Sequence, residues 1–85
     1  MVPYGPMLMS PATMALHYGQ AIFEGMKANK HAVTGEPLLF RPEMHVERIN
    51  RSATRMAMQT IPSEIFMNAL HYLLDIDREW IPQSE

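Results

Sequence analysis

Seven prolines divide this chain into short segments and limit the structure that each segment can adopt. Three of them, Pro3, Pro6 and Pro11, fall within residues 1–14. Each proline lacks a backbone N–H and disfavours helix at the residue before it, so we expect residues 1–14 to be extended or looped. The apolar side chains in this stretch predict that it lies against another surface; they are Val2, Tyr4, Met7, Leu8 and Met9.

The other four prolines fall where the sequence predicts that elements begin or end. Pro37 suits the first residue of a return strand, where a missing donor is tolerated. Pro42 suits the first turn of a helix. Pro62 precedes Ser63, which we expect to cap the N-terminus of a second helix, and Pro82 ends that helix.

Hydrophobic spacing predicts two amphipathic helices, over about residues 43–58 and 63–80. In the first, apolar residues recur three or four positions apart and form one stripe of Val46, Ile49, Ala53 and Met56. In the second we expect a broader buried face, made of Ile65, Phe66, Ala69, Leu70, Tyr72, Leu73, Ile76 and Trp80.

The segment before these helices predicts an antiparallel β-hairpin. Its arms are 26–33 and 38–40, and Thr34 and Gly35 form the turn between them. Upstream, the two glycines within residues 14–28 predict strand, turn and strand again. The predicted fold class is therefore α+β, with an extended N-terminal segment and a β-hairpin packed with two amphipathic helices.

Composition excludes several classes of protein. A chain of 85 residues holds one small domain at most, and its 47% hydrophobic content is too high for a disordered chain. The absence of cysteine excludes disulfides and thiolate metal sites and favours a reducing, cytoplasmic location. The formal charge of −2 argues against a nucleic-acid partner. No apolar run approaches the ~20 residues that span a membrane, and no signal peptide is expected.

Few side chains form a pattern that carries chemistry. The four histidines have no metal-ligand spacing, so we expect no metal site, and no glycine-rich phosphate loop is present. Arg48, Arg51 and Arg55 share one face of the first predicted helix, which is either a solvated face or an anion site. Lys27 and Lys30 lie in the predicted hairpin, where exposure makes a reactive amine improbable.

Residues 9–28, MSPATMALHYGQAIFEGMKA, resemble branched-chain amino acid aminotransferases, the pyridoxal-phosphate enzymes of fold type IV. A second similar block runs from Leu39 to Met56 and contains Phe40-Arg41-Pro42, Arg48 and Arg51-Ser52-Ala53. The tail over residues 75–82 is similar to the helix that follows in the family. D-amino acid aminotransferases and aminodeoxychorismate lyases share this fold and are sister alternatives.

The resemblance implies site roles for four residues. Arg48 would hold the phosphate of pyridoxal 5'-phosphate. Tyr18 and Phe23 would line the apolar side-chain pocket, against the alternative of ordinary core packing. Gly25 would keep the backbone close at the pocket rim, against the alternative of a plain turn glycine. The chain departs from the family at His45, where asparagine is usual.

A further departure is Asn29, which stands where the family often has an aromatic residue. The lysine that carries the cofactor lies in the family's larger C-terminal domain, so no catalytic residue is expected here. Residues 1–85 would be a single partial domain, part of the small N-terminal domain, without the large lysine-bearing domain.

The parent reaction would move the amino group between branched-chain amino acids and 2-oxoglutarate in a cytoplasmic homodimer. We expect the 85-residue chain alone to be inactive. The alternative is a truncated, non-catalytic homologue that serves as a structural or interaction module.

Overall fold

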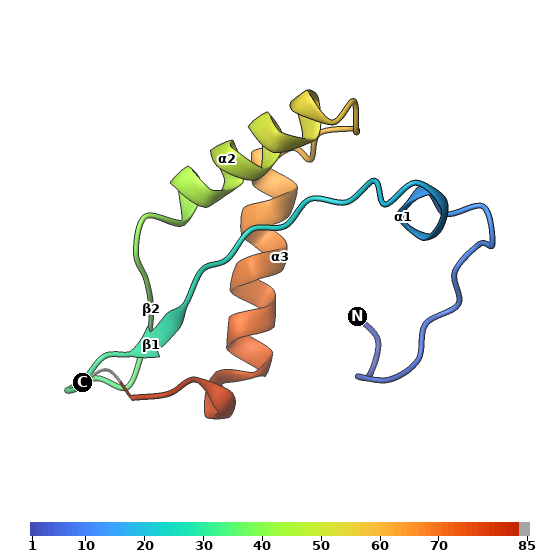
Figure 1. Cartoon of the computed structure of the whole chain (residues 1–85). Coiled ribbons are helices and arrows are strands. Elements are labelled where there is room, and N and C mark those ends of the chain that lie inside the picture. The colour runs from blue at the N-terminus through green and yellow to red at the C-terminus, as the bar shows by residue number, and fades with distance from the viewer. Residues whose placement is uncertain (84–85) are drawn as a thin grey trace.

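The computed structural model describes residues 1–83 as two crossing helices, a small hairpin and a long N-terminal arm (Figure 1). Helix α2 and helix α3 pack against each other, and the hairpin of β1 and β2 lies at one end of the pair. The elements run in the order α1 Met14–His17, β1 Ala28–Lys30, β2 Pro37–Leu39, α2 Pro42–Arg55, α3 Ser63–Ile76 and a 3-10 turn Arg78–Trp80. The predicted α+β class is confirmed.

The hairpin forms where the sequence predicts it, with shorter arms. Ala28 pairs with Leu39 and Lys30 pairs with Pro37 in antiparallel register, so Pro37 does begin the return strand. Gly35 adopts the left-handed conformation (φ 72°) and its N–H donates to the carbonyl of His31 at 2.9 Å, which closes the loop. Residues 31–33, which the prediction assigned to the first arm, belong to the loop.

The end of the described chain returns to the hairpin. The Lys30 N–H donates to the carbonyl of Pro82 at 2.9 Å, on the edge of β1 that β2 leaves free. The neighbouring Ile81 is buried, with 8% of its surface exposed. The C-terminal segment therefore closes the hairpin side of the small core.

Helix α2 begins at Pro42 as predicted, and it ends at Arg55 rather than at residue 58. The Met58 N–H donates to the Ala53 carbonyl at 2.8 Å, and the Ala57 N–H donates to the Thr54 carbonyl at 3.2 Å. These two bonds form a Schellman motif, which requires a left-handed residue after the helix. Ala57 takes that conformation with φ 55°, so the backbone turns out of the helix before the apolar stripe ends.

Helix α3 corrects two predictions. Pro62 occupies the N-cap position, so Ser63 is already the first helical residue and its side chain makes no capping bond. The regular helix ends at Ile76, and the Trp80 N–H donates to the Asp77 carbonyl at 2.9 Å in the 3-10 turn that follows. The predicted helix over residues 63–80 thus divides into an α-helix and a tighter turn.

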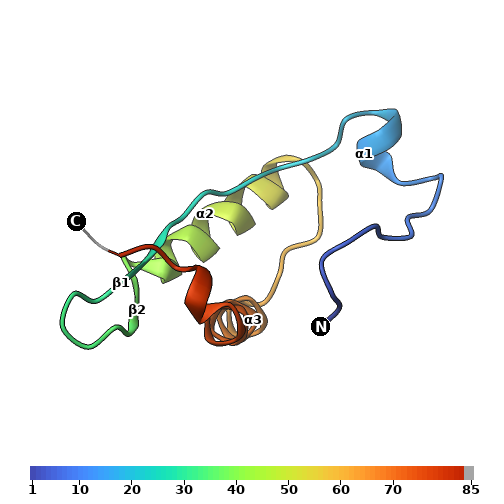
Figure 2. The same ribbon diagram turned by 90° about the horizontal axis from the view of Figure 1, so that it is seen from below.

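The predicted strand–turn–strand over residues 14–28 is wrong. Its first part is the single helical turn α1, and Gly19 (φ 64°) then redirects the chain. Residues 20–28 run extended alongside α2 (Figures 1 and 2), and every second residue from Gln20 to Ala28 is less exposed than its neighbours. The segment has the two-residue alternation of a strand, but over most of its length its neighbour is a helix.

The core is small, and the helices that pack against each other around it are α2 and α3. The buried apolar side chains among the described residues are Val46, Ala53 and Ile81. Asn50 of α2 fixes the loop to α3 with two hydrogen bonds: its Nδ2 donates to the Ile61 carbonyl at 2.7 Å, and its Oδ1 accepts from the Ile61 N–H at 2.8 Å.

The predicted apolar face of α3 is only partly packed. Its half-buried apolar residues are Phe66, Met67, Leu70 and Leu74, and two of these, Met67 and Leu74, lay outside the prediction. The remaining predicted members, Ile65, Ala69, Tyr72, Leu73, Ile76 and Trp80, are exposed. A broad helix face therefore has room for contacts that residues 1–83 do not make.

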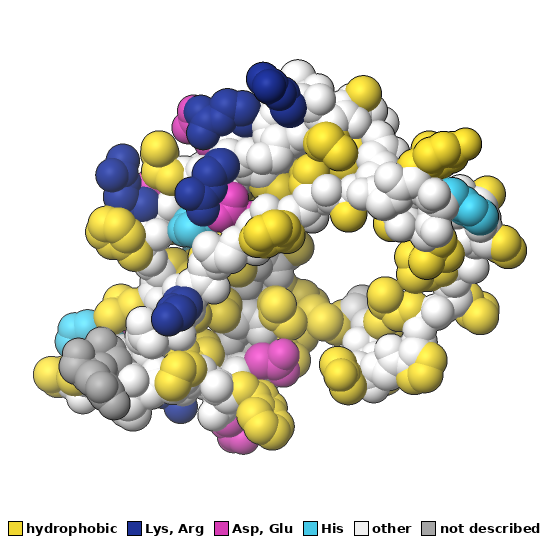
Figure 3. Space-filling view, viewed as in Figure 1, with side chains coloured by type: hydrophobic (Ala, Val, Ile, Leu, Met, Phe, Trp, Pro, Cys, Tyr) yellow, Lys and Arg dark blue, Asp and Glu magenta, His cyan; other side chains and the backbone are white. Residues whose placement is uncertain are grey.

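The N-terminal arm extends away from the helices and curves back toward α3 (Figures 1 and 3). Its first four residues border an open hollow with Leu73, Ile76 and Asp77. The predicted extended character of residues 1–14 is confirmed up to α1. No helix in the described part of the chain is long and apolar enough to cross a membrane.

We predict opposite effects of glycine at two alanines. Ala57→Gly should raise the free energy of unfolding by roughly 0.5–1 kcal/mol, because glycine adopts φ 55° without the side-chain strain of alanine. Ala69→Gly, at an exposed interior position of α3, should lower it by roughly 1 kcal/mol. Urea unfolding followed by circular dichroism measures both changes, and a loss of stability in Ala57→Gly would contradict the left-handed assignment.

Candidate functional site

The centre of the candidate site is a buried carboxylate on the extended segment. The alternation of residues 20–28 turns Glu24 toward α2, and only 6% of its side chain is exposed. Helix α2 presents His45 and Arg48 to it, three residues apart and therefore on one face. The segment is held further along by Gln20, whose Nε2 donates to the Met56 carbonyl at 2.8 Å.

Four N–H groups from three residues converge on the Glu24 carboxylate. Arg48 donates Nε–H to Oε2 at 2.7 Å and Nη2–H to Oε1, so one edge of its guanidinium meets both oxygens. His45 Nδ1 lies 2.9 Å from Oε1, and the Gly25 N–H donates to the same oxygen at 3.1 Å. Because an ionised carboxylate only accepts, the Nδ1 of His45 carries the hydrogen.

These contacts stabilise the charged form of Glu24. The Arg48 guanidinium, followed by His45, lowers the pKa of Glu24 to about 2 against an ordinary value of 4.5. The same pair raises the pKa of Arg48 above its ordinary value. Both groups are therefore ionised across the whole neutral range, and the pair is a fixed feature of the site.

Arg48 retains hydrogen-bonding capacity after this pairing. A guanidinium has five N–H groups, and Glu24 uses the two on the Nε edge. The Nη1 group and the outer N–H of Nη2 make no hydrogen bond with a described residue, and 57% of the Arg48 side chain is exposed. The free end of the fork has the planar geometry that matches a phosphate or carboxylate.

Three of the four predicted site residues are brought together. Phe23, Gly25 and Arg48 line one hollow of about 250 Å³ with Glu24 and Ser52. Phe23 is 92% exposed, so the core-packing interpretation of its side chain is wrong. Tyr18, at the end of α1, is 81% exposed, which excludes core packing there too, and it is not among the residues that line this hollow.

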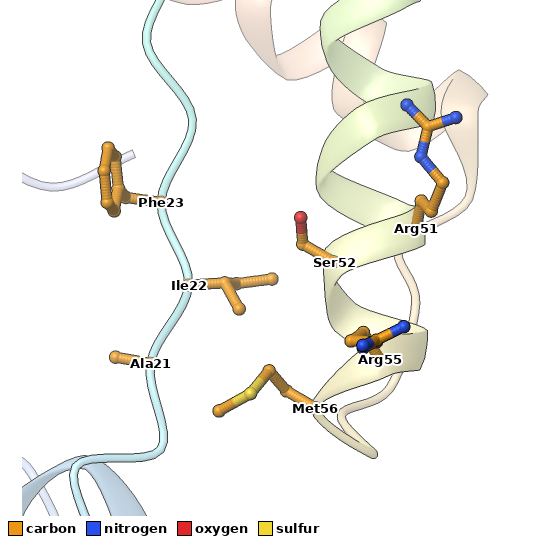
Figure 4. Close-up of a pocket in the computed structure, with 7 residues that line it drawn as sticks. All are labelled: Ala21, Ile22, Phe23, Arg51, Ser52, Arg55 and Met56. Atoms are coloured by element: carbon orange, nitrogen blue, oxygen red, sulfur yellow. The ribbon is translucent and has the colours of Figure 1, made fainter.

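A larger neighbouring hollow of about 450 Å³ separates the extended segment from the C-terminal half of α2 (Figure 4). Ile22, Ser52 and Met56 point into the gap, whereas Ala21 and Phe23 point to the far side of the segment. Arg51 and Arg55 are at its border and form no ion pair with any residue in 1–83. The wall of this hollow is apolar with a basic rim.

Helix α2 carries three arginines together with two exposed acids, Glu43 and Glu47. Figure 3 shows several basic side chains over α2, with acidic side chains among them, and other basic side chains nearer the hairpin; the arginines of α2 are Arg48, Arg51 and Arg55. A second shallow hollow borders Arg48 on the side of Arg41 and Met44. Of the two sequence interpretations of these arginines, a solvated face describes Arg51 and Arg55, while Arg48 is fixed by a buried acid.

The two departures from the family pattern have different structural roles. His45, one of these departures, donates from Nδ1 to the Glu24 carboxylate at 2.9 Å. Asn29 lies in β1 opposite Leu38. Asn29 is half-buried and Leu38 is 45% exposed.

Glu24 is the functional residue that the sequence prediction missed. The available signal was a single acid within an otherwise apolar or small stretch, Ala21 to Met26, in a chain with basic residues spaced along one helix face. The alternation in exposure over residues 20–28 is visible only in the folded structure, so the sequence alone does not show which side of the segment faces α2. Neither Lys27 nor Lys30 is among the described residues that line the Arg48 hollow.

The whole chain matches curated aminotransferases. It is 48% identical to the probable branched-chain-amino-acid aminotransferase of Staphylococcus epidermidis, over 99% of this chain and 23% of that relative. It is 43% identical to the branched-chain-amino-acid aminotransferase of Mycolicibacterium smegmatis over 98% of this chain. It is 40% identical to branched-chain-amino-acid transaminase 1 of Bacillus subtilis, also over 98%. The chain spans about 23% of the length of these relatives, and no protein-family model matches it.

Acid should remove the contribution of Glu24 to stability. Because its folded pKa of about 2 lies below the ordinary 4.5, this contribution is complete above about pH 5 and is lost as pH falls toward 2. We therefore expect Glu24→Gln to lower the urea midpoint at pH 7, and the difference from the parent chain to shrink toward pH 2. Glu47→Gln, which removes an exposed acid of α2, is the matched control. A difference that is constant from pH 7 to pH 2 would refute the assignment.

Proposed function

Because the chain belongs to the branched-chain-amino-acid aminotransferase family over nearly all of its length, we propose that it supplies part of a cofactor and substrate site of such an enzyme. In this proposal it forms part of the small N-terminal domain of a fold-type-IV transaminase. The complete enzyme transfers the amino group between branched-chain amino acids and 2-oxoglutarate. The cofactor is pyridoxal 5'-phosphate, and the location is cytoplasmic, in accord with a sequence that has no cysteine.

The arrangement of Arg48 is the observation that carries this proposal. Its side chain is held by Glu24 on one edge, and the other edge is open beside the hollow that Phe23 and Gly25 border. A phosphate group matches that open edge in charge and in planar geometry. The residues present therefore fit the phosphate end of the cofactor, and Arg48 would hold it.

The chemistry of the reaction would come from elsewhere. Pyridoxal phosphate, when bound, supplies an aldehyde that bonds the amino group and a ring that withdraws electrons. The bond to the cofactor aldehyde needs a partly desolvated lysine. Lys27 is exposed, and Lys30, which is half-buried rather than exposed as expected, does not line the Arg48 hollow. This chain would contribute binding and orientation: Arg48 would fix the phosphate and so the position of the ring.

The apolar side of the site would favour an aliphatic substrate. Phe23 lies one residue from Glu24 and presents a nearly free aromatic face, and Tyr18 presents another at the end of α1. In this proposal both become pocket walls for an isoleucine, leucine or valine side chain when the rest of the enzyme covers them. Gly25 has no atom within 4 Å of the position that a Cβ would take, so the backbone there is open to close approach.

The exposed apolar surfaces would be contact areas for the remaining domain or for a second subunit of a homodimer. They include Tyr72 and Ile76 on α3 and Trp80 in the 3-10 turn after it, and on the N-terminal arm Tyr4 and Leu8 are fully exposed. Isolated exposed apolar side chains are normal, but contiguous patches usually mark an interface. These faces support an assembly larger than the 85 residues.

We predict that Arg48→Lys weakens binding of pyridoxal 5'-phosphate about tenfold, because lysine keeps the charge but loses the planar fork. Titration followed by amide NMR of the chain measures this affinity. Arg55→Lys is the matched control on the same helix and should bind as the parent chain does. Equal affinity in the parent and Arg48→Lys would remove Arg48 from the cofactor site.

We also predict that the chain alone produces no glutamate from leucine and 2-oxoglutarate in the presence of pyridoxal 5'-phosphate. The reason is the absence of a lysine at the Arg48 hollow. A coupled assay for glutamate, with a complete bacterial branched-chain aminotransferase as positive control, checks this expectation. Any glutamate formation above that of a blank without the chain would contradict the prediction, and its loss in Lys27→Met or Lys30→Met would identify the lysine responsible.

A further inference from the structure

The buried position of Glu24 suggests a role beyond that of a surface ion pair. Exposed pairs contribute little to stability because water competes for both partners. Here the acid is 6% exposed and the arginine is 57% exposed, so the pair has one buried and one accessible member. A buried carboxylate that receives four N–H groups is an anchor for the accessible partner.

The edge of the Arg48 guanidinium that Glu24 contacts determines which N–H groups remain free for a ligand. Glu24 meets the Nε edge of Arg48 and not the end of the fork. An acid on the end of the fork would compete with an incoming anion. An acid on the Nε edge leaves the Nη1 side free for a ligand. It also restricts the rotamers of the Arg48 side chain, so less conformational entropy is lost when a ligand binds.

His45 and Gly25 fix Glu24 in turn. The imidazole donates from α2 and the backbone N–H donates from the extended segment, so the carboxylate cannot rotate away without losing partners on both elements. Arg48 is thus positioned by a network that spans two elements distant in sequence. The hydrogen bonds of Glu24 also keep Phe23 and Gly25 at the border of the Arg48 hollow.

We propose that Glu24 is a positioning residue, which holds the Nε edge of Arg48 and so directs the other edge of the guanidinium to a phosphate group. This inference rests on the proposed function, because it assumes that Arg48 contacts the cofactor phosphate. It predicts that neutralising Glu24 changes the affinity for phosphate in the direction opposite to the one that charge alone would give. Simple electrostatics says that neutralising an acid beside an anion site strengthens anion binding, whereas loss of positioning weakens it.

The test is a titration of the 85-residue chain with pyridoxal 5'-phosphate, followed by amide NMR. We expect Glu24→Gln to weaken binding about tenfold, the loss that accompanies a misplaced charged hydrogen bond. The matched control is Glu47→Gln, which removes the same charge from the residue that precedes Arg48, is exposed, and forms no ion pair with a described residue. It should bind unchanged or slightly more tightly.

A second readout follows Arg48 without any ligand. In the parent chain its Nε–H signal, identified by its absence from Arg48→Lys, should exchange slowly with water, and Glu24→Gln should abolish that protection. Glu24→Asp keeps the charge but shortens the reach, so it should also lose protection and affinity. This variant provides the test if Glu24→Gln does not fold.

The outcomes separate the two proposals. If Arg48→Lys binds as the parent chain does, or the parent chain does not bind, the cofactor role of Arg48 fails and the positioning role fails with it. If Arg48→Lys weakens binding while Glu24→Gln and Glu24→Asp bind as tightly as the parent chain or more tightly, only the positioning role of Glu24 is overturned.

Discussion

The contact between Glu24 and Arg48 determines how the first third of this chain relates to the rest. Residues 20–28 are extended but pair with a strand only at Ala28, so their backbone contributes few interactions that hold them in place. Side chains do this instead: Gln20 bonds to the end of α2, and Glu24 bonds to its middle. Phe23 and Gly25 lie beside Arg48 because their common neighbour, Glu24, is held there.

The need for such a polar anchor follows from the small apolar core. Val46, Ala53 and Ile81 are the buried apolar side chains of the described chain, and a core of this size leaves little stability to spare. A large part of the apolar content is instead exposed on α3 and the N-terminal arm. The chain spans 23% of its relatives' length, and contacts that cover these exposed apolar faces would add to its stability.

Sequence patterns predicted the elements whose signals are local. Pro42 began a helix and Pro37 began a strand as expected, because proline acts through its own missing N–H and fixed φ. The C-terminal end of α2 was not predicted, because the residue in the left-handed conformation after it is Ala57, where the usual sequence signal is glycine. The role of residues 20–28 could not be read because a strand-like segment against a helix lacks the apolar alternation of a half-buried strand. Arg48 was predicted as a site residue through resemblance, while its partner Glu24 required the tertiary contact.

Holding the cofactor and performing its chemistry are separable tasks, and the proposed function assigns only the first of them to this chain. A phosphate is a binding handle that takes no part in bond making, so a preorganised arginine can hold it without a reactive lysine nearby. Preorganisation needs only residues close in space, and here one extended segment and one helix provide them. The reacting amine needs a desolvated environment, which the exposed side chain of Lys27 does not have. The proposed phosphate contact of Arg48 and the predicted lack of turnover are therefore compatible in the same 85 residues.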